Sequence, residues 1–405
     1  MNAAGLTMRN GPPFKAGGIR VAWLLPTVKS QNYWQPLLRE FAKLFPQTVL
    51  FTGAWAGFLP GCEGTFEVKM VGEFRTLALP RGGHVADSGY EGLNLYSPAI
   101  LGELRRYKAD VIFTSAFGLW TLCALGHKFL AHAKVVVLLD GISESTEYLR
   151  SPRLPLRKLI ARRADFAVGN SLAACQYLQC ELGMRPHKVQ HHAYLVPDVS
   201  TLRAGRGEPM PVGSAAHPNF LFVGQIIERK GWRYLLEAVH LLMQRGRRDF
   251  SVSMIGNGHE MPQLRESIRL LELGKVVAAP GPVPYEDLWK CYENCDVFIL
   301  PALEDVWGMV VSEAMAFGKA VLCTKHAGAA ELVRDGTNGF VFDPRDPAEL
   351  AAHMEKFLDQ PTLVSQFGAN AKAAVALHTP QNAAREMAEV VSIVLNEHSA
   401  AYEPV

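Results

Sequence analysis

The chain has 405 residues, 49% of them hydrophobic and 20% charged, and its formal net charge at pH 7 is +2. This length exceeds one ordinary hydrophobic core and predicts two folded domains, and the composition argues against large-scale disorder. A balanced charge gives no electrostatic reason to expect nucleic-acid binding. The seven cysteines are scattered and odd in number, so they predict small core residues rather than a disulfide framework.

The sequence offers no membrane-spanning segment. No apolar run approaches the ~20 residues that cross a bilayer, and residues 1–18 lack the apolar core of a signal peptide. We therefore expect a cytoplasmic protein.

Short apolar runs alternate with segments of helical spacing in both halves of the chain. This alternation predicts parallel sheets covered by helices. The expected strands are IRVAWLLP (19–26), TVLFTG (48–53), DVIFTS (110–115), KVVVLLD (134–140) and DFAVGNS (165–171), then FLFVG (220–224), FSVSMIG (250–256), KVVAAPG (275–281), DVFILP (296–301) and AVLCT (320–324). Residues 201–219 are rich in Gly, Pro and small polar residues and predict a linker.

A basic segment stands in the first half, just before the strand that begins near Phe166. Six cations fall within fourteen residues that contain no acid: Arg150, Arg153, Arg157, Lys158, Arg162 and Arg163. Helical spacing from Pro155 onward groups Leu156, Leu159 and Ile160 on one side, with the cations around them. Two readings are open: a helix that lies on an anionic membrane surface, or a solvated basic helix whose leucines pack on the sheet.

The second half carries two phosphate-binding patterns. In NFLFVGQIIERKG (219–231), a strand runs through Gly224 into a turn where Lys230 supplies a point charge and Arg229 a forked donor; the plain alternative is a solvated turn. In LEDVWGMVVSEAMAFGKAVLCT (303–324), a helix begins at Gly308 behind a buried strand. The free N–H groups of its first turn suit a diphosphate.

Two acids accompany this helix start. Asp305 stands just before the first turn, whose members are Gly308, Met309 and Val310, and Glu313 lies inside the helix as a hydroxyl acceptor. Judged by spacing alone, Asp305 is a cap and Glu313 a solvated acid. IGNGH, beginning at Ile255, has only two glycines after its strand, so it is weak evidence for a nicotinamide site.

The stretch from Gly281 to Asp346, with its EAMA helix, small-residue loop, Glu331 and DGTNGF turn, resembles the signature of retaining GT-B glycosyltransferases of family 4 (glycosyl transferases group 1). The resemblance implies that Asp305 and Glu313 contact the donor sugar and the nucleotide ribose. It also implies a donor site of Gly224, Gln225, Arg229, Lys230, Val283, Gly308, Met309, Val310 and Glu313.

Three residues depart from the family pattern. Asp305 replaces the usual Glu, with Glu304 beside it as a substitute, and Gln225 replaces the usual Arg. Asp140 stands where many relatives have a His near the reacting sugar, and it either assists the acceptor or caps the turn after its strand. Asn32, Tyr33 and Trp34 either face the acceptor or pack the helix expected from Pro36.

The resemblance implies an α/β fold with two facing Rossmann-like doubly wound domains. Residues 1–205 would bind the acceptor, with 381–405 returning as a crossover helix, and residues 206–380 would bind the nucleotide sugar. The implied activity is retaining, metal-independent and cofactor-free transfer of a hexose to a hydroxyl of a saccharide or lipid-linked glycan of the cell envelope. A non-catalytic nucleotide-sugar-binding module and a soluble transferase for a small metabolite are the alternatives.

Overall fold

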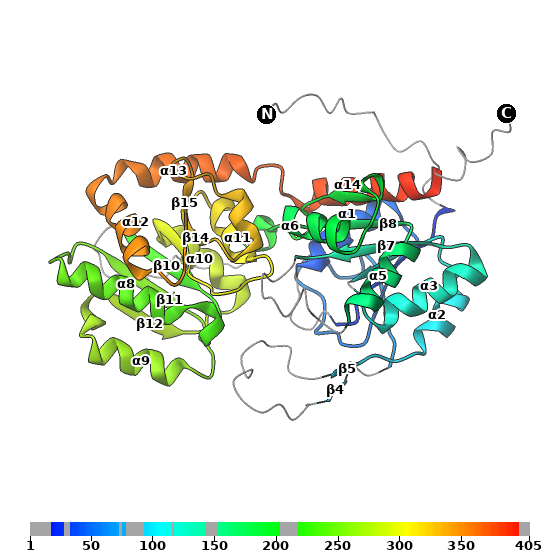
Figure 1. The fold of residues 1–405 in the computed structure, drawn as a ribbon, viewed down its shortest axis with the longest axis horizontal. Coiled ribbons are helices and arrows are strands. Elements are labelled where there is room, and N and C mark those ends of the chain that lie inside the picture. The colour runs from blue at the N-terminus through cyan, green and yellow to red at the C-terminus, as the bar shows by residue number, and fades with distance from the viewer. Residues whose placement is uncertain are drawn as a thin grey trace.

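The computed structural model describes residues 18–27, 33–72, 75–77, 93–115, 117–141, 153–202 and 218–396. Its elements form two lobes, each built around one sheet (Figure 1). Within the described part of the chain, no helix is both long and apolar enough to span a membrane. Arg150, Asn32 and most of the expected linker lie outside the described residues.

The first sheet has seven strands, all parallel, in the order β3-β2-β1-β6-β7-β8-β9. In chain order they are β1 (Val21–Leu24), β2 (Thr48–Thr52), β3 (Glu67–Met70), β6 (Val111–Ser115), β7 (Lys134–Leu139), β8 (Phe166–Gly169) and β9 (Val189–His191). β4 (Arg75–Leu77) and β5 (Leu93–Leu95) form a separate antiparallel pair. The helices of this lobe are α1 (Trp34–Leu44), α2 (Ile100–Tyr107), α3 (Leu119–Ala131), α5 (Leu154–Arg163), α6 (Leu172–Gln176) and α7 (Val199–Leu202).

The second sheet has six parallel strands in the order β12-β11-β10-β13-β14-β15. They are β10 (Asn219–Val223), β11 (Ser251–Ile255), β12 (Val277–Gly281), β13 (Val297–Leu300), β14 (Ala320–Thr324) and β15 (Gly339–Phe342). The helices are α8 (Trp232–Gln244), α9 (Met261–Leu270), α10 (Leu288–Asn294), α11 (Met309–Ala316), α12 (Pro347–Asp359) and α13 (Thr362–Ala374).

The last helix, α14 (Pro380–Asn396), leaves the second lobe and packs along α1 of the first (Figure 1). Its apolar face is fully buried, with Met387, Val390, Val391 and Val394 at 0% exposure. The 3- and 4-residue spacing of these side chains is what places them on one stripe of the helix.

The core has three parts. One apolar cluster covers the outer face of the second sheet under α8 and α12, and another covers the first sheet under α2 and α3. The largest runs continuously from the inner face of the first sheet to that of the second, and includes Trp34, Tyr194, Trp307 and the apolar stripe of α14. The two lobes therefore share one apolar contact region.

All ten strands expected from the sequence are present, and four regions were not expected: β3, β9, β15 and the β4/β5 pair. The expected helix at Pro36 begins two residues earlier, at Trp34. Six of the seven cysteines are buried, including Cys291 and Cys295, and Cys180 is exposed.

Candidate active site

The strand order of the second sheet reverses between β10 and β13. From this point β11 and β12 extend one way, and β14 and β15 the other. The loops that leave the carboxyl ends of β10 and β13 therefore turn in opposite directions and frame a crevice, the usual place for a ligand in such sheets. The loop after β10 carries Lys230, and the loop after β13 carries Asp305.

A glycine brings these two loops together. Gly231 has φ +68°, and a Cβ at this position would lie 1.9 Å from the carbonyl oxygen of Pro301. Leu303 N–H also donates to the Arg229 carbonyl at 2.9 Å. Only a glycine allows the turn after β10 to pack this closely on the end of β13, because both the left-handed backbone and the contact exclude a side chain.

Lys230 and Asp305 form an ion pair at 2.5 Å between Nζ and Oδ2, with side chains only 15% and 14% exposed. Beside it, Arg229 Nη1 donates to the Glu304 carbonyl at 2.9 Å. Asp305, and not Glu304, is therefore the acid next to the lysine. Arg229 is engaged with the backbone of the same loop, so one of its forked donors already has a partner.

The start of α11 is fixed from the side of β14. Gly308 adopts φ +91° as the residue before the helix. Asp305 N–H donates to the His326 carbonyl at 3.0 Å, and Ala329 N–H donates to the Trp307 carbonyl at 2.7 Å. Met309 and Val310 are half-buried in the first turn. The N–H groups of this turn have no partner within the helix and lie on the same loop as Asp305.

Glu313 has partners that the sequence did not suggest. Its side chain is 3% exposed and lies between two tyrosines: Tyr292 donates to Oε2 at 2.7 Å and Tyr285 to Oε1 at 3.2 Å. Burial raises the pKa of the Glu313 carboxyl, and the two hydroxyl donors act in the opposite direction. The alternative of a solvated helix acid, which spacing alone favours, is therefore wrong for this residue.

Asp140 follows β7 at the carboxyl edge of the first sheet. Tyr194 donates to its Oδ1 at 2.8 Å, and burial raises the pKa of the Asp140 carboxyl to about 6. The next residue, Gly141, touches the second lobe, because a Cβ there would lie 2.2 Å from the carbonyl oxygen of Val306. Asp140 is thus adjacent to the loop that carries Asp305.

A second contact between the lobes centres on Glu331, which belongs to the short helix η7 (Gly328–Leu332). Leu172 N–H, at the start of α6, donates to its Oε2 at 2.8 Å, and His191 Nε2 lies 3.2 Å from its Oε1. Hydrogen bonding to Glu331 raises the pKa of His191. His192 lies 3.4 Å from Glu386 of α14. No sequence spacing indicates these pairs, because their members are far apart along the chain.

The remaining expected residues have varied surroundings. Trp34 is 1% exposed and stacks on Tyr194 at 5.2 Å between ring centroids, so it packs the core. Gln225 is exposed, and Val283 is partly buried against the core shared by the lobes. Within the described residues, no group of three or more His, Cys, Asp or Glu side chains could hold a metal ion.

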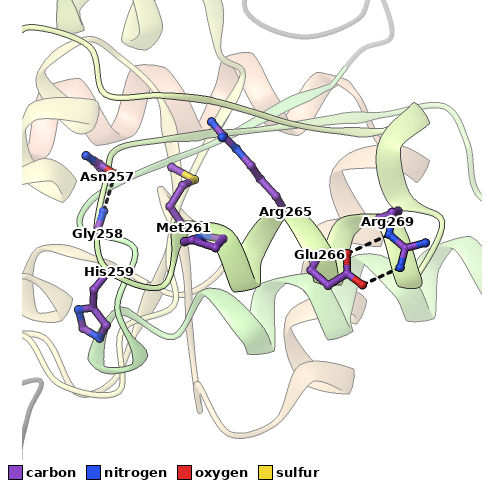
Figure 2. A pocket seen from close by; sticks show the side chains of 8 residues that line it. Asn257, Gly258, His259, Met261, Arg265, Glu266 and Arg269 are labelled. Carbon is purple, nitrogen blue, oxygen red and sulfur yellow. Dashed lines mark hydrogen bonds and ion pairs between the residues drawn. The ribbon is translucent and has the colours of Figure 1, made fainter.

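A cavity of about 720 Å³ lies away from these residues, beside the loop after β11 and along α9 (Figure 2). Figure 2 shows that Glu266 and Arg269 bond to each other in its wall, at 2.6 and 2.9 Å. It is lined by Asn257, Gly258, His259, Met261, Pro262, Arg265, Glu266 and Arg269. Lys230, Asp305 and Glu313 are not among the residues that line it.

The loops around Lys230 and Asp305 belong to a region that matches a known family. Residues 215–374 match the model of glycosyl transferases group 1. This region is a glycosyl transferases group 1 domain. It includes β10 to β15 and both loops at the point where the strand order reverses.

Curated relatives extend the similarity in part. The chain is 28% identical over 288 residues to WcaL of Salmonella typhimurium, described as a colanic acid biosynthesis glycosyltransferase, and 29% identical over 279 residues to WcaL of Escherichia coli. These matches cover 68% and 66% of this chain, and 69% and 66% of the relatives. A D-inositol 3-phosphate glycosyltransferase of Streptomyces griseus is 31% identical over 39% of its own length.

Solved structures share the fold over most of the chain. Anabaena HepE in complex with UDP-glucose is similar with a TM-score of 0.71 and 21% identity, over 92% of this chain and 99% of that one. WaaG, involved in lipopolysaccharide biosynthesis, gives a TM-score of 0.63 and 16% identity, over 91% and 99%. The two parallel-sheet lobes are the GT-B fold of glycosyltransferases, as the sequence predicted.

Proposed function

We propose that the protein is a retaining glycosyltransferase that moves a sugar from a nucleotide-diphosphate donor to a hydroxyl acceptor, without a metal or other cofactor. The observation that supports this proposal most directly is the Lys230–Asp305 pair. It joins the loop after β10 to the loop that leads into α11, at the reversal point of the second sheet. It lies within the glycosyl transferases group 1 domain.

In this proposal the leaving diphosphate is stabilised by fixed positive charge. Lys230 supplies a point charge, and the first-turn N–H groups of Gly308, Met309 and Val310 with the positive end of the helix dipole supply the rest. These groups are held before the reaction by contacts of Gly231 and Arg229, so little reorganisation is needed when charge develops on the phosphate. Arg229 keeps the loop of Asp305 in place.

The three acids would have separate tasks. Asp305 orients Lys230 and accepts a sugar hydroxyl, Glu313 accepts ribose hydroxyls, and Asp140 approaches the acceptor from the first lobe. Front-face transfer requires that the bond from the anomeric carbon to the phosphate oxygen breaks while the bond to the acceptor oxygen forms on the same face. The leaving phosphate oxygen then takes the acceptor proton.

The test is a panel of sugar nucleotides, beginning with UDP-sugars because HepE was solved with UDP-glucose. We expect slow release of nucleoside diphosphate with one donor, unchanged activity in EDTA, and a product that keeps the anomeric configuration of the donor by NMR. Loss of turnover in EDTA that Mn²⁺ or Mg²⁺ restores would refute metal independence. Calorimetric binding without hydrolysis or transfer would establish a binding module instead.

We further propose that the acceptor is a saccharide or lipid-linked glycan of cell-envelope polysaccharide synthesis. The support is the similarity to WcaL, described for colanic acid biosynthesis, and to WaaG, involved in lipopolysaccharide biosynthesis. Such acceptors are found at membranes, and the first lobe carries a surface that could bind to a membrane.

That surface is the basic face of α5. Ile160 is fully buried, whereas Leu156 and Leu159 are 38% and 48% exposed, and Phe129 at the end of α3 is 64% exposed. Arg163 lies over the Phe129 ring at 5.9 Å. Exposed apolar side chains among cations are the pattern of a helix that lies at an anionic interface, where each cation contributes about 1 kcal/mol.

Liposome co-sedimentation tests this surface. The double variant Lys158→Gln/Arg162→Gln should weaken binding to anionic vesicles by more than about tenfold, and binding of the wild type should fall as salt rises. Arg157 is left intact because it donates to the Tyr177 hydroxyl at 3.1 Å. The matched control, Arg265→Gln/Lys275→Gln, removes the same charge from the second lobe and should change little. Equal loss in both variants would show a general charge effect.

A further inference from the structure

Glu313 is a carboxylate that two tyrosines hold from two different elements. Tyr292 comes from α10 and is 0% exposed, and Tyr285 comes from the short helix η6 (Tyr285–Asp287) and is partly exposed. Each donates to a different oxygen of Glu313. Because the two bonds come from separate directions, they fix both the position and the plane of the carboxylate.

The two hydroxyls also affect its charge. A carboxylate at 3% exposure is destabilised by the loss of water, and a donor to its oxygen favours the ionised form. Burial raises the pKa of Glu313, and the hydrogen bonds from Tyr292 and Tyr285 lower it. Each oxygen still has a second lone pair that can accept a further hydroxyl group. Both oxygens act as acceptors alone only when the carboxylate is ionised, because a protonated carboxyl uses one oxygen as a donor.

We propose that Tyr285 and Tyr292 are positioning residues for the donor: they hold the buried Glu313 ionised and oriented so that its free lone pairs accept the ribose hydroxyls of the nucleotide. This inference rests on the proposed function and assigns roles to two residues outside the acidic motif. Removing either hydroxyl shifts Glu313 toward its protonated form, which cannot accept in the same way.

The charged and titratable groups around the cluster are few. Tyr285 and Tyr292 are the groups that act on Glu313. Burial raises the pKa of Tyr285 and of Tyr292, and the charge of Glu313 acts in the same direction on both. Asp198, in front of α7, adds to this for Tyr285, and Cys295 adds to it for Tyr292. Both tyrosines therefore keep their protons throughout the range in which Glu313 titrates, and remain donors.

The consequence is a change in pH dependence rather than a uniform loss. In Tyr292→Phe the pKa of Glu313 rises, so at low pH the carboxyl is protonated and the donor binds more weakly, and at high pH it is ionised and binding recovers. The donor KM should rise about tenfold at the acidic end and return to within about twofold of wild type at the alkaline end, with kcat little changed. Glu313→Gln, which resembles the protonated carboxyl, should be weak at every pH.

The experiment uses binding as well as turnover. Calorimetry measures the affinity for UDP and GDP at several pH values. The proteins compared are the wild type, Tyr285→Phe, Tyr292→Phe and Glu313→Gln. Whichever nucleotide binds more tightly is also measured in its 2′-deoxy form. Tyr107→Phe is the matched control, because its hydroxyl donates to backbone oxygens of the first lobe. Thermal unfolding reports folding separately, and Tyr292→Phe should lose more stability at high pH than at low pH because its lost bond is stronger to the ionised carboxylate.

The outcomes separate the inference from the proposed function. The positioning role is supported if Tyr292→Phe loses nucleotide affinity in a pH-dependent way and this loss is smaller for the 2′-deoxy nucleotide. This result would hold even if no acceptor is found. A loss that is equal at every pH, or no loss, would show that the tyrosines only support the fold. If neither nucleotide binds the wild-type protein, the donor site is wrong and the inference fails with it.

Discussion

The carboxyl edges of the two sheets are organised differently. At the edge of the second sheet, three loops are tied together by backbone contacts that only glycines allow, and charged groups are paired across the crevice. At the edge of the first sheet, aromatic packing dominates: Trp34 stacks on Tyr194, and the Tyr194 hydroxyl donates to Asp140. One edge is a fixed charged frame, and the other is mainly aromatic around Asp140.

This difference fits two kinds of ligand. A nucleotide diphosphate has the same charged groups whatever sugar it carries, so a rigid frame of opposite charge suits it. A hydroxyl acceptor has no fixed charge and varies between enzymes of one fold. Changes at the second edge should therefore affect catalysis most, and changes at the first should affect specificity and pH dependence.

The largest effect is expected for Lys230→Ala, which removes the charge in front of α11. We expect kcat/KM to fall about 10²- to 10³-fold, the loss typical when one preorganised stabiliser of developing charge is deleted. Steady-state kinetics measures this. Lys325→Ala is the control, because that lysine pairs with Asp343 at the surface and should have near wild-type activity. Equal activity of both variants would remove Lys230 from the mechanism.

The two acids of the second edge should differ from each other. Asp305→Ala should mainly lower kcat, because it releases Lys230 and the sugar, whereas Glu313→Ala should mainly raise the donor KM. Glu313→Ala should also lower the free energy of unfolding by about 1–3 kcal/mol, since it leaves the buried Tyr292 hydroxyl without an acceptor. Kinetics and chemical denaturation check both. If both variants show small and equal changes in kcat and KM, neither acid contacts the donor.

The contact between the edges can be tested at Gly141. A Cβ in Gly141→Ala would meet the Val306 carbonyl, so the two loops must separate. We expect kcat/KM for transfer to fall about tenfold, because misplacing the two loops should raise the free energy of the transition state by about 1.4 kcal/mol. The affinity for the nucleotide should change less. Gly126→Ala, on α3, where an added Cβ meets nothing within 4 Å, should behave as wild type. An unchanged rate of transfer would show that the close contact between these two loops is not needed for activity.

Asp140→Asn should have the smallest effect on activity, and its main effect should be on the pH dependence of stability. The pKa of Asp140 in the folded protein is about 6, above its ordinary value of 3.8, so the fold favours the protonated form. Ionisation therefore costs stability as pH rises through this interval, by up to about 3 kcal/mol. Asp140→Asn should be more stable than wild type above about pH 6 and similar below about pH 4. Thermal unfolding across pH measures the difference, and a pH-independent difference would contradict it.

Much of the fold follows from local patterns. The ten apolar runs with their turns predicted ten of the parallel strands, and Gly308 with the apolar stripe behind it predicted α11. β9 and β3 were missed because Val189–His191 and Glu67–Met70 are short edge strands with few apolar residues, so their identity depends on the neighbour they pair with.

The site was predictable only in part. Lys230 and Asp305 could be recognised as candidate site residues because each lies in a loop after a predicted strand. Their pairing depends on the order of the strands in the sheet, which local sequence patterns do not reveal. The partners of Glu313 come from α10 and η6, and those of Glu331 from the other lobe, so neither cluster has a sequence spacing to recognise. Residues of this kind become visible only when separate elements are brought together.

The return of α14 to the first lobe has a consequence for how the protein folds during synthesis. The first lobe is made first, yet the helix that covers α1 follows the whole second lobe in the chain. Until that helix is made, the apolar surface that Met387, Val391 and Val394 will bury stays exposed to water. Completion of the first lobe must therefore wait for the whole second lobe, and a chain that stops before Pro380 leaves its own N-terminal half open to aggregation.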